Sequence, residues 1–214
     1  MLEYLHIVGI SLLIAIIPFV IVLMTSFTRI SIVLTFLRQA LSTSVPSAHI
    51  IIGLSLILTV YIMHPVIKQI QTEAVDPYVE GKFGEKEEAA KIFITKAWPA
   101  LGTFMLFHTR EKDLQLFLDM SNVEVQADHI EVSSFPWYCV IPAFVLSELR
   151  TAFMLGFLLF LPFLIIDMVV SSLLMSMGMV LLPPVMISFP FKILLFVVVD
   201  GWRLVISQVV HGYL

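Results

Sequence analysis

The chain has 214 residues, 59% of them hydrophobic and only 13% charged, with a formal net charge of −4. A soluble domain of this length has too little interior to bury so much apolar surface, so we expect an integral membrane or membrane-assembled protein. The sequence shows no basic patch of the kind that binds nucleic acid. The single cysteine, Cys139, rules out an internal disulfide and a cysteine-based metal site. We expect it to serve in packing, and an interchain disulfide is the alternative.

The first apolar run extends from Leu5 to Met24, which is long enough to cross the roughly 30 Å hydrocarbon core of a bilayer as a helix. It has the length of a signal peptide but lacks a basic start and a small-residue cleavage site, so we expect it to be retained. Apolar residues at helical spacing continue this region to Leu41. The segment from Ser42 to Pro46 then predicts a turn.

The second apolar run spans residues 50–67 and is also predicted to be helical. Arg29 and Arg38 lie before it and place the loop between the two runs on the cytoplasmic side, because basic residues favour that side of a membrane. The next stretch, from about residue 68 to 136, is the part of the chain with a water-exposed composition. It would then lie on the opposite side of the membrane.

This polar stretch predicts a small helical subdomain inserted between membrane-associated helices. We expect one of its helices to be interrupted near Pro99 and a second to begin with Thr109 as its N-cap. The sequence therefore divides into N-terminal hydrophobic helices (1–71), a polar helical subdomain (72–136) and a C-terminal hydrophobic helical region (137–214).

The C-terminal region contains two further apolar runs. The run from Trp137 to about Leu182 is too long for one membrane crossing, and we expect the SELR segment at 147–150 and Pro162 to divide it. The last run covers residues 185–214. Every predicted element is helical, so the fold class is all-α, with membrane-associated helical hairpins.

Five ionisable residues interrupt these last two runs, although a charge that faces lipid costs about 2.5–3.5 kcal/mol or more. They are Glu148, Arg150, Asp167, Lys192 and Asp200. Glu148 and Arg150 point to different faces of a helix, and Lys192 and Asp200 would lie roughly 12 Å apart along one. Each charge therefore needs a partner in another segment, for example Arg150 with Asp167, or in another subunit. An ion pathway through an isolated carboxylate is a third reading.

The turn between the two runs is apolar, whereas a turn between membrane helices normally carries polar residues. Its residues are Met177, Gly178, Met179, Val180, Leu181 and Leu182. An exposed apolar turn marks an interface or a constriction that gates a pore by excluding water. A loop buried within a single subunit is the alternative.

No motif of a hydrolase, nucleotide-binding protein or metalloenzyme is present, and we expect no catalytic residues, cofactor or metal site. Intramembrane proteolysis would need two carboxylates that share a proton. Asp167 and Asp200 are the available pair, but no catalytic turn surrounds them. A non-enzymatic protein is the stronger interpretation.

Three segments carry a resemblance to a known family. They are PFVIVLMTSFTRISIVLTFLRQAL (18–41), IPAFVLSELRTAFMLGFLLFLPFLIIDMVVSSLLMSMGM (141–179) and ISFPFKILLFVVVDGW (187–202). The chain resembles the FliP/SctR family of export-gate subunits of flagellar and virulence type III secretion systems. HTREKDLQLF (108–117) is more similar to the flagellar branch.

The resemblance implies a homo-oligomer of five copies that assembles with FliQ/SctS-like, FliR/SctT-like and FlhB/SctU-like subunits into a helical cone. It implies a place in the bacterial inner membrane, in a flagellar basal body or an injectisome, with the assembled core largely on the periplasmic side. The function implied is a channel for unfolded export substrates. An ion-coupled transporter subunit or the scaffold of another membrane complex is the alternative function.

Three of the five charges, Glu148, Arg150 and Lys192, lie in motifs that carry the resemblance. Ser147–Arg150 matches the family's SEL-K motif and Pro190–Lys192 its PFK motif, and we expect Glu148 to pair with Lys192 of a neighbouring copy. The family's gate loop commonly has glycine followed by three methionines. Here Gly178 is followed by one methionine, so an apolar ring rather than methionine sulfur would close the pore.

Overall fold

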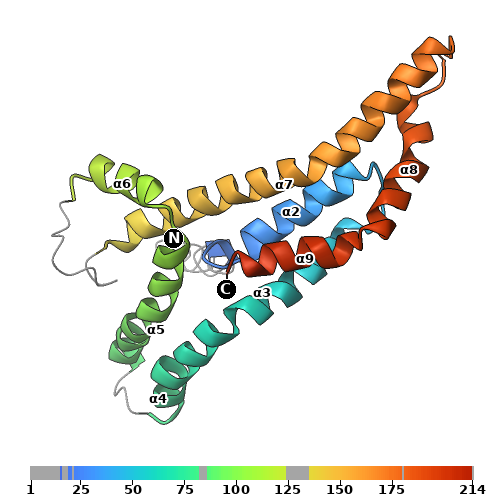
Figure 1. Cartoon of the computed structure of the whole chain (residues 1–214). Helices are drawn as coiled ribbons and strands as arrows, with labels where there is room; N and C mark the ends of the chain where they lie inside the picture. The colour runs from blue at the N-terminus through green and yellow to red at the C-terminus, as the bar shows by residue number, and fades with distance from the viewer. Residues whose placement is uncertain are drawn as a thin grey trace, which may run out of the picture. The chain divides into compact units, whose positions relative to one another are not determined.

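The computed structural model describes residues 15, 19–20, 22–81, 86–123, 135–179 and 181–213 (Figure 1). This part of the chain is helical and contains no strand, which confirms the all-α class. The helices are α2 (Phe27–Ala40), α3 (Ala48–Ile70), the π-helix η1 (Gln71–Val75), α4 (Asp76–Val79), α5 (Lys86–His108), α6 (Glu111–Met120), α7 (Trp137–Ser176), α8 (Pro184–Val198) and α9 (Gly201–His211). Most of the first apolar run lies outside the described residues, as does most of the loop after α6.

Three local expectations are wrong. Helix α7 is one helix of 40 residues that continues through residues 147–150 and Pro162, and α5 likewise continues through Pro99. Proline removes one backbone hydrogen bond but need not end a helix whose flanking turns are held by neighbouring helices. Thr109 is not the N-cap of α6, because its hydroxyl donates to the Met105 carbonyl at 2.7 Å, and Arg110 takes that position.

Within the described residues, two continuous helical stretches are long and apolar enough to cross a membrane. They are Ala48–Val79, which includes η1 and α4, and Trp137–Ser176. Helices α8 and α9 pass the same test only as a pair, and they are bent by 63° at the break between them. These stretches make the chain a membrane protein of helical hairpins, as its composition predicts.

The chain forms two compact units that do not follow sequence order. One contains the described residues of Met1–Thr28 and Thr59–Glu148, and the other contains Arg29–Leu58 and Leu149–Leu214. Helices α3 and α7 each contribute one part to either unit. The three-part division expected from the sequence stays a prediction.

In the first unit, α6 is held against the start of α7 at both of its ends. At its N-terminus the Arg110 backbone N–H donates to Ser147 Oγ at 3.0 Å, and the Ser147 hydroxyl donates to Asp113 Oδ2 at 2.7 Å. At its C-terminus the buried Cys139 thiol donates weakly to the Phe117 carbonyl and to Ser121 Oγ, at 3.7 and 3.4 Å. The expected packing role of Cys139 is therefore confirmed.

The second unit packs α2 against the later part of α7 and against α9. The apolar face of α2, which includes Ile30, Val33 and Leu37, is almost completely buried. Arg29 is also buried, and it joins the start of α2 to the end of α9. Its guanidinium donates to the Gly212 carbonyl at 3.1 Å and lies 3.9 Å from the centre of the Tyr213 ring.

Close packing of α2 on α7 depends on Gly156. A Cβ atom at this position would lie 2.6 Å from Phe36 Cδ2. The same Cβ would lie 2.7 Å from Phe36 Cγ and 3.1 Å from Phe36 Cβ, so rotation of the ring, which packs edge-on against Phe153, would not relieve the overlap. We expect Gly156→Ala to lower the free energy of unfolding by about 1–3 kcal/mol, the usual cost of overpacking. Thermal unfolding of the detergent-solubilised protein measures this change.

Gly53 in α3 provides the matched control. No atom lies within 4 Å of the place where its Cβ would stand. Because alanine is the better helix former by about 1 kcal/mol, Gly53→Ala is expected to leave stability unchanged or raise it slightly. Equal effects of the two substitutions would contradict the proposed contact between Gly156 and Phe36.

Candidate functional site

The turn between α7 and α8 has a defined backbone structure. The Gly178 N–H bonds to the Met175 carbonyl and the Met179 N–H to the Leu174 carbonyl, which ends α7 with the left-handed glycine of a Schellman motif (φ 77°). Pro183 then precedes α8, and Pro184 occupies its first position, where the missing N–H costs nothing. The sequence therefore builds a hairpin whose arms are α7 and α8.

The apolar side chains of this turn are exposed within the chain. Leu181 is 99% exposed, and Met177, Met179 and Leu182 are also classed as exposed. Val180 lies outside the described residues. The turn is therefore not covered by its own subunit at these positions, while its expected role as a gate stays a prediction.

A partly buried ion pair joins the two arms of the hairpin. Lys192 of α8 is only 1% exposed, and its Nζ lies 2.6 Å from Asp167 Oδ2 of α7. The Ser188 hydroxyl donates to the other carboxylate oxygen, Asp167 Oδ1, at 2.5 Å. Each oxygen of the Asp167 carboxylate therefore has a partner on α8, the Lys192 ammonium for one and the Ser188 hydroxyl for the other.

A third segment reaches the same cluster from the end of α2. The Lys192 ammonium donates to Ser42 Oγ at 2.8 Å. Ser42 has a left-handed backbone (φ 55°), and its N–H bonds to the Gln39 carbonyl, in a position where glycine is usual. Since a left-handed conformation costs a non-glycine residue about 1 kcal/mol or more, the bond to Lys192 is a physical reason for serine at this position.

This geometry revises the expected charge partners. Lys192 has a partner within its own chain in Asp167, while its expected pairing with Glu148 of a neighbouring copy stays a prediction. Arg150 and Asp167 lie on one continuous helix, roughly 25 Å apart along its axis, so they cannot pair within the chain. Glu148 is completely buried and Arg150 is exposed.

Asp200 has a backbone role rather than a place in the cluster. It is exposed, lies between α8 and α9, and has a left-handed conformation with φ 51°. Its backbone carbonyl accepts the Leu204 N–H, and its side chain makes no capping bond to α9. The sharp bend between the two helices therefore begins at this residue.

The pair of Asp167 and Lys192 could have been predicted from the symmetry of the hairpin. Residues at equal distances from a turn lie at the same height on the two arms of a hairpin. The midpoint of 167 and 192 is 179.5, which falls in the apolar turn after Gly178. Ser188, one helical turn before Lys192, follows from the same reasoning. Ser42 could not be found in this way, because its contact is between segments 150 residues apart.

Helix α8 has a polar inner face and an apolar outer surface. Ser188, Lys192 and Phe196 recur at intervals of four residues and are its buried side chains. Most of the other large side chains of the helix are apolar and exposed, including Met186, Phe191, Leu194, Val197 and Val198. A helix with this distribution of side chains is stable when an apolar environment surrounds its outer surface.

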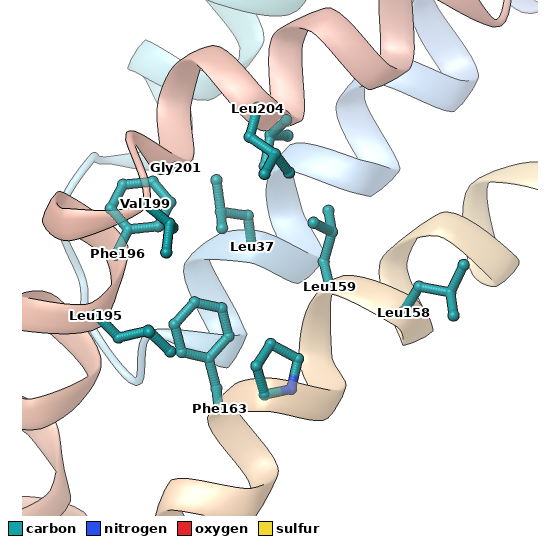
Figure 2. Close-up of a pocket in the computed structure, with 11 residues that line it drawn as sticks. Leu37, Leu158, Leu159, Phe163, Leu195, Phe196, Val199, Gly201 and Leu204 are labelled. Atoms are coloured by element: carbon teal, nitrogen blue, oxygen red, sulfur yellow. The ribbon is translucent and has the colours of Figure 1, made fainter.

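A second feature of this unit is an apolar groove along α9 that contains two neighbouring pockets, of ≈ 290 Å³ and ≈ 340 Å³. Its walls come from α2, α7, α8 and α9. Figure 2 shows Leu37, Leu159 and Phe163 around one end of this space. All lining residues are apolar or glycine except Gln208, so the groove offers no chemistry for catalysis.

The Ser147 bridge of the first unit belongs to the SELR segment and can be tested alone. Ser147→Ala removes the hydroxyl that bonds to the Arg110 N–H and to the buried Asp113 carboxylate. We expect it to lower the free energy of unfolding of this unit by about 1–3 kcal/mol. The amides of α6 should then exchange with deuterium more rapidly, which mass spectrometry measures. Ser172→Ala, at an exposed position of α7, is the control. Unchanged protection of α6 in Ser147→Ala would show that the bridge does not hold the helix.

Comparison with known proteins identifies the family. The FliP family model matches residues 10–209. The chain is 48% identical over 197 residues to the flagellar biosynthetic protein FliP of Bacillus subtilis, covering 92% of this chain and 86% of the relative. For FliP of Aquifex aeolicus the identity is 43% over 203 residues, covering 94% and 82%.

A third relative, FliP of Cereibacter sphaeroides, is 40% identical over 210 residues, which cover 98% of this chain and 67% of the relative. The match extends over both the helices that form the hairpin and the inserted polar helices. On the strength of the family model and these relatives, the chain belongs to the FliP family.

Proposed function

We propose that this chain is a core pore-forming subunit of the flagellar type III export apparatus, through which unfolded proteins cross the bacterial inner membrane. Family membership supports this function over an ion-coupled transporter or a scaffold of another complex. The role is structural, and the chain performs no catalysis. Its expected partners are further copies of itself, five in all, and FliQ/SctS-like, FliR/SctT-like and FlhB/SctU-like subunits.

The observation that carries the proposal is the apolar length of α7. Its 40 residues extend roughly 60 Å, twice the thickness of the hydrocarbon core. Exposed apolar side chains occur along nearly all of it, from Trp137 to Met175. To fit within the core the helix would need a tilt of about 60°, beyond the usual limit of about 40°. Lipid alone therefore cannot cover this surface.

The charges on α7 support the same conclusion. They leave uncharged stretches of only 11 residues (137–147), 16 residues (151–166) and 9 residues (168–176), whereas a simple crossing needs about 20. We assign the stretch 151–166 to the hydrocarbon core. The rest of the apolar surface of α7, including the hairpin tip beyond Asp167, would be covered by other subunits of the complex.

In such an assembly the exposed turns of several copies would meet around a common axis. A ring of apolar side chains from Met177, Met179, Val180, Leu181 and Leu182 would exclude water and ions until a substrate passes. The left-handed backbone of Gly178 would set the direction in which each turn leaves α7. The cluster of Asp167 and Lys192 would hold the two arms of each hairpin together behind the ring.

Ion permeability tests the proposed gate. We expect replacement of Met179, Val180 and Leu181 by serine to make the membrane leak small ions, because a polar constriction stays wet. Conductance of the complex in planar bilayers measures the leak, and native gel electrophoresis checks that the complex still assembles. Serine at the exposed positions Leu194, Val197 and Val198 of α8 is the matched control. An assembled complex with unchanged conductance would contradict a gate at this turn.

A further inference from the structure

We propose that α2 acts as a strut that fixes the bend between α8 and α9, and that Arg29 is the positioning residue at one end of this strut. The two helices are bent by 63° at the break between them. Side chains from both sides of the break contact residues near the two ends of α2, and all of these residues belong to the second unit. The angle between the hairpin arm α8 and the C-terminal helix α9 would therefore be set by the length of α2.

The inner face of the bent pair follows one regular pattern. The buried side chains of α8 recur every four residues and end at Phe196. After the bend the same interval resumes on α9 and the turn that follows it, with Gly201, Val205, Val209 and Tyr213 buried. The interval across the bend is five residues. A single extra residue thus turns the inner face into its new direction without interrupting it.

At the far end of α9 the contact with α2 is made by Arg29, which is only 4% exposed. Its guanidinium donates to the Gly212 carbonyl at 3.1 Å and lies 3.9 Å from the centre of the Tyr213 ring. The carbonyl groups at the end of a helix have no partner within the helix and carry the negative end of its dipole, so a cation is favoured there. A Cβ atom on Gly212 would lie 2.9 Å from Arg29 Nη1, so the guanidinium and the final turn are in close contact.

On the other side of the bend the contact is made by Lys192 of α8. Its ammonium donates to the hydroxyl oxygen of Ser42, two residues after the end of α2. Arg29 and Ser42 are 13 residues apart, which is roughly 20 Å along a helix. Lys192 and Tyr213 are 21 residues apart, which would be roughly 32 Å along a straight helix. The bend takes up the difference, so that both ends of α2 are reached together.

Close packing at the bend agrees with a fixed angle. The left-handed Asp200 is followed by Gly201, and a Cβ atom at Gly201 would overlap the ring of Phe196. Figure 2 shows Phe196 beside Gly201 at this point. The Phe196 ring also packs edge-on against Trp202, with 5.5 Å between ring centres. The break between α8 and α9 is therefore a packed structure and not a frayed helix end.

The middle of α9 is packed less tightly. The pockets of ≈ 290 and ≈ 340 Å³ both lie beside it, and Leu204 and Val205 line both of them. Because close packing is what normally holds a helix in place, the position of α9 depends more strongly on the contacts at its ends. Loss of the Arg29 contact should therefore allow α9 to move.

A distance measured within one chain of the complete complex tests the strut. Spin labels are attached to Met186→Cys in α8 and Gln208→Cys in α9, both exposed positions, in a Cys139→Ser background. Labelled chains are diluted with unlabelled ones, so that only pairs within a chain are detected. The two positions are 22 residues apart, roughly 33 Å along a straight helix and roughly 29 Å with the bend of 63°. We expect a narrow distribution that corresponds to the shorter distance.

Release of either end of α2 should have the same effect on this distance. Arg29→Ala removes the contact at the far end of α9. Ser42→Gly removes the bond to Lys192 without backbone strain, because glycine suits the left-handed conformation of this residue. Both substitutions should broaden the distribution and shift it by up to about 4 Å toward the straight form. Arg29→Lys keeps a cation over the Tyr213 ring and should restore the narrow distribution.

Arg203→Ala is the matched control, since it removes an exposed arginine from α9 itself and should leave the distribution unchanged. An unchanged distribution in Arg29→Ala would overturn the proposal. So would a change in Arg29→Ala with none in Ser42→Gly, because Arg29 would then make only a local contact. If Arg29→Ala does not fold, Tyr213→Ala in the last turn takes its place with the same expected results. The measurement does not depend on conductance, so its outcome is independent of the proposed gate.

Discussion

Replacing Lys192 with alanine is expected to reduce the amount of folded protein in the membrane more than any other single substitution in the hairpin. The Lys192 side chain is 1% exposed and neutralises Asp167, so its removal leaves a partly buried carboxylate with only the Ser188 hydroxyl as a hydrogen-bond donor from the hairpin. Removing one partner of a fully buried ion pair costs about 3–5 kcal/mol, and because Asp167 is 27% exposed the expected loss lies at the lower end of that range. This is a large part of the 5–15 kcal/mol of stability that is typical of a folded domain. Steady-state levels and thermal unfolding of the extracted protein measure the loss.

Second-site rescue identifies the partner of Lys192. We expect Lys192→Asp to be rescued by Asp167→Lys, which reverses the pair within the chain. Rescue by Glu148→Lys instead would restore the intersubunit pairing that the sequence suggested. The neutral double variant Asp167→Leu with Lys192→Met should recover much of the lost stability, because no buried charge remains. Lys68→Ala, at an exposed position of α3, is the control and should have little effect.

The second large effect is expected at Leu173, on the arm of α7 beyond Asp167. This side chain is exposed within the chain, and we assign its surroundings to neighbouring subunits. An unpaired carboxylate buried in such an interface costs about 3 kcal/mol or more, and every interface of the ring would carry one. Leu173→Asp should therefore leave the protein in the membrane fraction but reduce the assembled complex more than about tenfold. Native gel electrophoresis after mild extraction separates the two forms.

The conservative variant Leu173→Met is the control and should assemble normally, because methionine occupies nearly the same volume. Two results would contradict the assignment. Normal assembly of Leu173→Asp would mean that the position faces water. Loss of the protein from the membrane fraction would mean that the position faces lipid, where a carboxylate prevents insertion.

The helical fold could be predicted because its signals are local. Apolar runs long enough for membrane helices and a polar stretch between them are visible in the sequence alone. The expectations were wrong where contacts with other segments overrode a local sequence rule. Pro99 and Pro162 interrupt a helix only when the freed backbone groups find no other partner, and the sequence does not show those partners. Thr109 has the composition of an N-cap, but its hydroxyl bonds backwards to Met105.

The candidate site could be predicted in part. Its charged residues and apolar turn were visible as exceptions in a hydrophobic sequence. The partner of Lys192 was missed because α7 was expected to break at Pro162, and a broken arm does not align residue 167 with residue 192. The groove along α9 has no sequence signal, since it consists of ordinary apolar residues from four helices. It arises from their packing alone.

The central claim is that other subunits cover the apolar surface of α7 that lies outside one bilayer thickness. Fluorescence quenching along α7 tests it directly, with a label on single cysteines in a Cys139→Ser background of the assembled complex. The account predicts quenching by brominated lipid at Phe153, Phe157 and Ile165, and no quenching by lipid or by aqueous iodide at Leu173. Lipid quenching at Leu173 as strong as at Phe157 would contradict it, because lipid would then cover the helix along its length.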